Sequence, residues 1–132
     1  MRRVSIVIGA CFVLALALTV MGQGGRDISA IMKDVGPLAT GVAAKAPADA
    51  AADAAKLEGL FKEAQSFFAK DKVADAEGWA KAASEAAGKA AKDLKAGTVD
   101  KAAKNLGINC KQCHDVHREA GPEKGQFKYK KE

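Results

Sequence analysis

Apolar side chains recur at helical spacing in four segments, from about Asp27 to Ala44, Pro47 to Ala69, Ala76 to Ala96 and Val99 to Ala120. Within each segment they lie three and four residues apart, which gathers them on one face of an α-helix. The expected inward faces are Ile28, Ile31, Met32, Val35, Leu38 and Val42; Leu57, Leu60, Phe61, Ala64, Phe67 and Phe68; Trp79, Ala83, Ala86, Ala90 and Leu94; and Val99, Ala103, Leu106, Cys110, Cys113 and His117.

Proline and glycine mark the expected ends of these helices. Gly36-Pro37 interrupts the first pattern, and a proline inside a helix removes a hydrogen bond, so we expect a kink or a local break there. Pro47 suits the first turn of the second helix, and Gly97 suits the end of the third. Thr98 is a natural N-cap for the fourth helix, which Gly121-Pro122 should stop.

The segments between and after the helices are short or polar. Lys70 to Asp75 is charged and is expected to connect the second and third helices, and the Lys-rich tail to Glu132 is expected to fray. No strand pattern is visible. The sequence therefore predicts an all-α fold, an antiparallel four-helix bundle.

The N-terminus carries a different pattern. Arg2 and Arg3 precede an apolar run from Val4 to Met21, which is the layout of a secretory signal peptide, with cleavage expected after Gly22. The run is almost long enough to span a bilayer, so a retained membrane anchor is the alternative. A lipoprotein site at Cys11 fits less well, because little apolar sequence precedes it. We expect a signal peptide at 1–22 and one domain at 23–132.

Composition and charge narrow the function. Without Arg2 and Arg3, the 21 basic and 16 acidic residues leave a net charge of +3, and lysines alternate with acids along helical faces. This describes a solvated surface, so we expect no nucleic-acid binding, although an acidic protein partner would be favoured. Alanine dominates the predicted helices, and alanine fills little volume. A large buried ligand would help to fill such a thin core.

The residues that carry chemistry are Cys110-Lys111-Gln112-Cys113-His114. This is Cys-x-x-Cys-His, the attachment motif of c-type haem. Two thiols about one helical turn apart can reach the vinyl groups on one porphyrin edge, and the next residue offers its imidazole to the iron. We therefore expect one covalent haem c on Cys110 and Cys113, with His114 as proximal ligand.

Other uses of the motif account for fewer of its residues. A thioredoxin-like redox pair needs a βαβ context, which is not visible. Zinc needs more ligands than two thiols and one imidazole. A structural disulfide would leave His114 without a role. An export signal also fits, because c-type haem is attached outside the cytoplasm, and it predicts a periplasmic protein.

The other axial position has one natural candidate. Once Met1 and Met21 leave with the signal peptide, Met32 is the remaining methionine, and it lies on the inward face of the first predicted helix. His117 follows His114 by three residues, so it lies on the proximal side of the haem. Met32 could equally fill a gap in the core, as methionines on such faces usually do.

Several motifs together resemble the class II c-type cytochromes, the cytochrome c-prime family, over Arg26 to Arg118. Arg26 followed by Met32-Lys33-Asp34-Val35-Gly36 is similar to the first-helix motif, although the spacing from Arg26 is slightly longer. Trp79 matches the tryptophan that opens the third helix, and Arg118 matches the arginine four residues after the haem histidine. His117 departs from the family, which usually has an aromatic residue there.

The resemblance implies a fold, a ligand set and two possible functions. It implies a four-helix bundle, as monomer or homodimer, with Arg26, Trp79 and Arg118 near the haem. Arg118 could equally be an exposed cation at the end of the helix, where the helix dipole favours positive charge. In the low-spin, c-556-like branch a first-helix methionine binds the iron, which implies Met32 as distal ligand and electron transfer to redox partner proteins. In the high-spin branch the sixth position is open and binds nitric oxide or carbon monoxide.

No acid–base set, phosphate loop or activated nucleophile is visible, so we do not expect an enzyme. The third alternative is a structural bundle without haem. A membrane contact is expected only if the N-terminal segment is retained.

Overall fold

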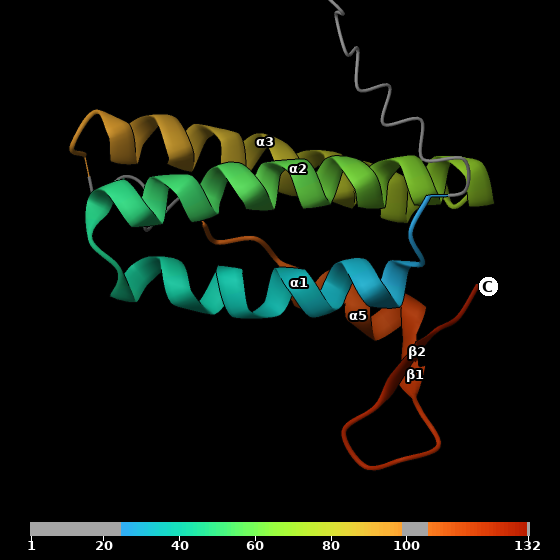
Figure 1. Cartoon of the computed structure of the whole chain (residues 1–132). Helices are drawn as coiled ribbons and strands as arrows, with labels where there is room; N and C mark the ends of the chain where they lie inside the picture. Colours follow the sequence, from blue (N-terminus) through green and yellow to red (C-terminus); the bar gives the residue numbers. More distant parts are fainter. Residues whose placement is uncertain (1–24, 99–105, 132) are drawn as a thin grey trace, which may run out of the picture.

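The computed structural model describes residues 25–98 and 106–131, and within them the chain is mostly helical. The order is α1 (Ile28–Gly41), the 3₁₀ turn η1 (Val42–Ala44), α2 (Pro47–Asp71), α3 (Ala74–Lys95), α5 (Cys110–His117), β1 (Arg118–Ala120) and β2 (Phe127–Tyr129). Figure 1 shows α2 and α3 side by side, with α1 along α2 and the hairpin of β1 and β2 projecting from one end. The mainly helical class predicted from the sequence is confirmed.

Helix α1 begins at a side-chain cap and runs through its proline. The Asp27 carboxylate accepts a hydrogen bond from the Ser29 N–H at 3.1 Å, as an N-cap does. The helix continues past Pro37, so the local break expected at Gly36-Pro37 is not found. Pro37 and Lys33, four residues earlier, are both exposed, so water can satisfy the carbonyl that proline leaves unbonded.

Helices α2 and α3 are long and closely connected. Pro47 occupies the first turn of α2, as predicted. Lys72 adopts a left-handed conformation with φ of +60°, and its N–H donates to the Phe68 and Ala69 carbonyls. The connection is thus only Lys72 and Val73, which is shorter than the predicted Lys70 to Asp75.

The core combines large side chains from α2 with small ones from α3. The buried residues of α2 include Leu57, Leu60, Phe61, Ala64 and Phe68, and those of α3 include Ala76, Ala80, Ala83, Ala87, Ala90, Ala91 and Leu94. Alanine lets the two helix backbones approach closely, which produces dense packing without large α3 side chains. Trp79 and Ala86, which were expected to face inward, are only partly buried.

Helix α3 ends as its sequence predicts. Gly97 has φ of +77°, and its N–H donates to the Leu94 carbonyl at 3.1 Å. The Thr98 N–H donates to the Asp93 carbonyl at 2.9 Å, which completes a Schellman motif. The predicted role of Thr98 as N-cap of a helix from Val99 lies outside the described residues, as do Val99 and Ala103.

The predicted fourth helix, Val99 to Ala120, is wrong in two of the parts that the structure describes. Leu106 to Asn109 are not helical, and α5 begins at Cys110. The helix ends at His117 instead of Ala120, because Arg118 is extended, with φ of −125° and ψ of 132°. Arg118 to Ala120 form a strand, so Gly121-Pro122 does not stop a helix but belongs to the turn after this strand.

The tail that was expected to fray forms a hairpin. Strands β1 and β2 pair antiparallel, with Arg118 opposite Tyr129 and Ala120 opposite Phe127. Gly121 donates to the Gln126 carbonyl at 2.7 Å, and Gly125 in the turn has φ of +86°. The hairpin is attached to the body where the Lys130 N–H donates to the His117 carbonyl at 3.0 Å.

Among the helices of residues 25–98 and 106–131, none has the length and apolar character needed to cross a membrane. The signal peptide expected at 1–22 lies outside these ranges and stays a prediction.

Candidate functional site

The three residues of the haem motif share the short helix α5. Its N-cap, Asn109, accepts a hydrogen bond from the Gln112 N–H at 3.3 Å, which fixes the start of the helix at Cys110. Cys113 follows one turn later and His114 comes next. Both cysteines are free thiols; Cys110 is exposed, and Cys113 is half-buried against the core. A single helical turn therefore presents both thiols and the imidazole.

Burial shifts the pKa values of His114 and Cys113. Burial, followed by the positive charge of Arg118, lowers the pKa of His114. A neutral imidazole is the form that binds a metal, so this shift favours ligation. Burial, followed by the negative charge of Asp75, raises the pKa of the Cys113 thiol. Cys113 is thus held as a thiol at neutral pH.

His117 lies one turn beyond His114 and is buried, with 4% of its surface exposed. Its Nε2 lies 3.1 and 3.2 Å from the two carboxylate oxygens of Asp75, at the start of α3. Its Nδ1 has no hydrogen-bond partner among the described residues. Three rings surround it, with centroids 6.0 Å away in Trp79, 6.3 Å in Tyr129 and 6.4 Å in Phe68.

Two carboxylates hold this cluster together. Burial alone would raise the pKa of Asp75, but hydrogen bonds from His117 and from the Ala76 N–H outweigh it and lower the pKa. The Tyr129 hydroxyl donates to Asp71 at 3.1 Å, and burial together with this carboxylate raises the pKa of Tyr129 to about 12. Strand β2 is therefore fastened to the junction of α2 and α3 beside α5.

Met32 lies on the first half of α1, partly buried and packed against the core. This half of α1 lies at the same end of the molecule as α5 and the hairpin (Figure 1), and α1 contacts β2. No described contact joins Met32 to His114. Its role as an iron ligand stays a prediction.

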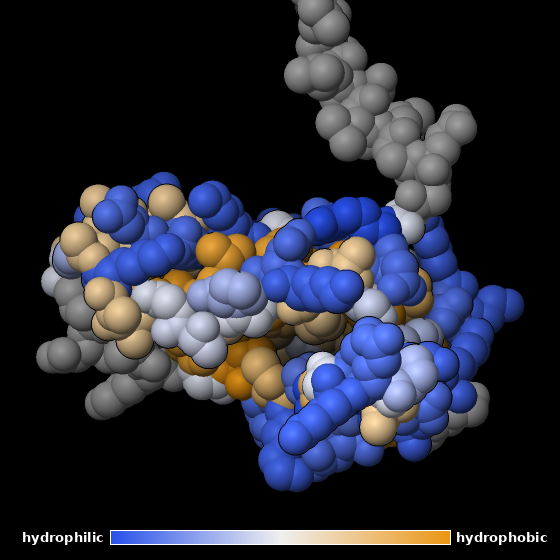
Figure 2. All heavy atoms as spheres, turned by 60° about the horizontal axis from the view of Figure 1, so that its bottom comes forward, coloured by the Kyte–Doolittle hydropathy of each residue, from blue (hydrophilic) through white to orange (hydrophobic). Residues whose placement is uncertain are grey.

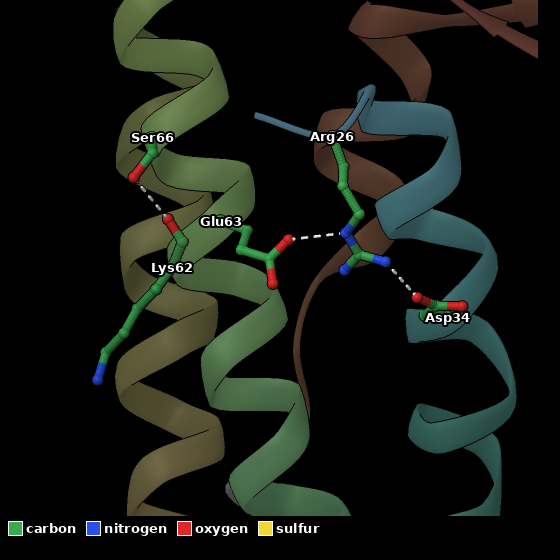
Figure 3. Close-up of polar contacts among 5 residues, drawn as sticks. All are labelled: Arg26, Asp34, Lys62, Glu63 and Ser66. Carbon is green, nitrogen blue, oxygen red and sulfur yellow. Dashed lines mark hydrogen bonds and ion pairs between the residues drawn. The ribbon is translucent and has the colours of Figure 1, made fainter. Parts of the chain in front are cut away.

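Arg26 makes two ion pairs on the surface. Its Nε donates to Glu63 of α2 at 2.9 Å, and a terminal nitrogen donates to Asp34 of α1 at 2.6 Å. Figure 3 shows the guanidinium between the two helices, with Ser66 bonded separately to the Lys62 carbonyl. These carboxylates give Arg26 a structural role in joining α1 to α2. The predicted role of Arg26 near a haem stays a prediction.

Arg118 and Trp79 lie close to α5 in different ways. Arg118 follows α5 directly, and its guanidinium carbon lies 3.8 Å from the centre of the Phe127 ring, which is a cation–π contact. Trp79 reaches the buried ring of His117 from α3. Arg118 and Trp79 both lie beside the C-terminal end of α5, which is compatible with the haem environment predicted for them.

The residues present fit a covalent haem by their chemistry. Two reduced thiols one turn apart and an adjacent neutral imidazole are the donors that such a group needs. Neither thiol is used in a disulfide. The described residues hold no cluster of three or more His, Cys, Asp or Glu side chains that would suit a bare metal ion.

Sequence reasoning missed the partners of His117. Nothing local to Asp75, Asp71 or Tyr129 indicates that they meet at α5, because the pairing depends on a tertiary contact over 42 residues between Asp75 and His117. One signal could have found the hairpin. Phe127-Lys128-Tyr129-Lys130 alternates apolar and charged residues after a segment with Gly121, Pro122 and Gly125, which is typical of a strand after a turn.

Comparison with known proteins adds no relative, because no family model, curated protein or solved structure matches the chain.

Proposed function

We propose that this chain is an exported, periplasmic electron-transfer protein that carries one haem c, covalently bound through Cys110 and Cys113 with His114 as proximal ligand. The observation that carries the proposal is the Cys-x-x-Cys-His motif on one turn of helix α5, with both thiols free. When bound, the haem supplies an iron that takes up and releases one electron.

The proposal extends to the fold family. The resemblance to the class II c-type cytochromes supports an antiparallel four-helix bundle, in which α5 carries the haem motif of the last helix. The packing of α1 along α2 and of α2 along α3 is compatible with three sides of such a bundle. The Asp75–His117 contact would hold α5 against the end of α3 at a fixed angle.

Four residues have distinct roles in this proposal. Cys110 and Cys113 would hold the group permanently, so it is retained through repeated turnover. His114 would bind from the proximal side as a neutral imidazole. Met32 would bind from the other side, and a histidine–methionine pair leaves no open position for a small gas. Little then has to move when an electron passes to a partner protein.

Visible spectra of the oxidised and reduced protein, with and without carbon monoxide, test this function. The full chain should be expressed with its N-terminal segment in a host that matures c-type haem. We expect sharp, split bands on reduction that carbon monoxide does not change. Met32→Ala should lose this pattern and bind carbon monoxide.

The matched control is Leu38→Ala, because Leu38 is another partly buried residue of α1. Met21 is not used, because it belongs to the expected signal peptide. Leu38→Ala should keep the wild-type spectrum. A broad high-spin spectrum that carbon monoxide shifts in the unmodified protein would instead assign gas binding at an open site, and Met32 would then be a core residue.

A further inference from the structure

Helix α5 is attached to the rest of the molecule by few side chains. Of its eight residues, only His117 is buried. Lys111 pairs with Asp115 inside the helix. Within residues 25–98 and 106–131, one side-chain hydrogen bond joins α5 to another helix or strand, and it connects His117 to Asp75. The end of the molecule that holds α5 and the hairpin presents mostly hydrophilic atoms (Figure 2), so His117 is the residue that fixes this helix to the core.

The Asp75 carboxylate that receives His117 is itself fixed. Its Oδ1 accepts a hydrogen bond from the Ala76 N–H at 2.8 Å, in the first turn of α3. Its two oxygens lie 3.2 and 3.1 Å from Nε2 of His117, so this nitrogen lies almost symmetrically between them. An ionised carboxylate only accepts hydrogen bonds, so Nε2 carries the proton. The direction of the imidazole is thus set from the backbone of α3.

The ring and the backbone of His117 are held by three further elements of the fold. Trp79 of α3, Tyr129 of β2 and Phe68 of α2 surround the ring, with centroids 6.0, 6.3 and 6.4 Å away. The His117 carbonyl accepts a hydrogen bond from the Lys130 N–H at 3.0 Å, just after β2. The residue is therefore fixed at its side chain and at its main chain.

A rotation of α5 about its axis moves His117 and His114 together. The two residues are three positions apart on a helix of eight residues, which places them about 60° apart around the axis. The backbone hydrogen bonds of so short a helix make it turn as one body. The contacts of His117 therefore decide which way α5 presents His114.

Packing alone does not require an imidazole at this position. An aromatic ring without nitrogen would fill the same space, whereas His117 leaves its buried Nδ1 without a hydrogen-bond partner among the described residues. An unpaired buried polar atom costs free energy. What the imidazole adds is a directional hydrogen bond to Asp75, and hydrogen bonds outside the ligand shell are what orient metal ligands in proteins.

We propose that His117, held by Asp75, is the positioning residue of the haem site and sets the orientation of His114 as an iron ligand. The inference rests on the proposed function, because it needs His114 to bind the haem iron. His117 and Asp75 act through α5 and do not themselves bind the iron.

Electron paramagnetic resonance of the oxidised, full-length, haem-bearing protein tests this role, because the g values of a ferric haem depend on the geometry of its axial ligands. Asp75→Ala removes the hydrogen-bond acceptor, and Asp75→Leu removes it while keeping the size of the side chain. The Asp75 side chain is 45% exposed, so both variants are expected to fold, which circular dichroism checks. Both should replace the single set of g values by a shifted or a second set. Asp75→Asn keeps an oxygen that accepts from Nε2 and should retain the g values of the unmodified protein.

The matched control is Glu77→Ala, because Glu77 is an acid in the same first turn of α3. It should leave the g values unchanged. Unchanged g values in both Asp75→Ala and Asp75→Leu, or an equal change in Asp75→Asn or in the control, would overturn the positioning role. The denatured mass of each sample reports the haem separately. Absence of haem from the unmodified protein would overturn the proposed function together with this inference, whereas unchanged g values in haem-bearing variants would overturn the inference alone.

Discussion

At the scale of single residues, the pKa of Asp75 depends on a hydrogen bond from His117, which lies 42 positions away in the sequence. Its carboxylate is the only partner of the buried His117 ring among the described residues, at 3.1 Å from Nε2. The Asp75 side chain itself is 45% exposed, so solvent weakens the charge interaction while the hydrogen bond remains.

Asp75→Ala should lower the free energy of unfolding by about 1 to 3 kcal/mol, because it leaves a second buried nitrogen of His117 without a partner. The pKa of Asp75 is lowered from 3.8, so its contribution is present above pH 3.8 and is lost as the pH falls below that value. Urea denaturation across this pH range measures the difference. Glu85→Ala, an exposed position of the same helix, should change the stability little; an equal loss there would contradict this account.

Tyr129 gives a second prediction with the opposite direction of pH dependence. Its pKa is raised to about 12 from 10.0, so the folded protein keeps the phenol proton after the unfolded chain has lost it. Stability from Tyr129 is therefore complete below pH 10 and declines as the pH rises towards 12.

Tyr129→Phe should remove this decline. At neutral pH it should cost about 0.5 to 1.5 kcal/mol, for the hydrogen bond to Asp71. The chain has one tyrosine, so its ionisation can be followed directly by ultraviolet absorbance. Ionisation near pH 10 in the folded protein would contradict the structure.

At the scale of elements, two glycines test different properties of α3. Gly97 tests a backbone conformation that disfavours side chains, and Gly78 tests helix propensity. Gly97 has φ of +77° at the end of α3, a conformation that residues with a Cβ disfavour. Gly78 lies inside α3, and nothing lies within 4 Å of the position that a Cβ would take there.

Gly97→Ala should lower the free energy of unfolding by about 1 to 2 kcal/mol. Gly78→Ala should raise it by about 0.5 to 1 kcal/mol, because alanine is the better helix former. Thermal unfolding of both variants provides the measurement. The same sign for both would show that α3 does not end in the left-handed turn described.

The elements also show what a sequence pattern can and cannot predict. Pro47 and Gly97 act through local backbone geometry, so they marked helix ends correctly. The fourth helix was predicted to continue to Ala120, but Arg118 to Ala120 pair with Phe127 to Tyr129 as a strand instead. That pairing joins two segments of the chain, and spacing along one helix carries no information about it.

The same distinction applies to the candidate site. Cys110, Cys113 and His114 are adjacent in sequence, and their meaning depends on spacing within one helical turn, so the sequence alone could identify them. Met32 was a candidate from its place on the first predicted helix, and the resemblance assigned it as the distal ligand and placed Arg26 near the haem. The structure describes Arg26 in ion pairs with Glu63 and Asp34, which no sequence pattern indicated.

At the scale of the whole molecule, three features concentrate at one end. The haem motif of α5, the buried His117 and the hairpin follow one another along the chain from Cys110 to Tyr129, and Trp79 and Phe68 pack on His117 from α3 and α2. The remainder of the described chain, α1 to α3, is an alanine-rich helical body that fixes this end through Asp71 and Asp75.

The most direct test of the central claim is the denatured mass of the protein expressed with its N-terminal segment in a host that matures c-type haem. Covalent attachment predicts a mass one haem above that of the polypeptide, and the double variant Cys110→Ser, Cys113→Ser should lose this addition. A polypeptide mass without haem, from cells that attach haem to a control cytochrome, would contradict the account.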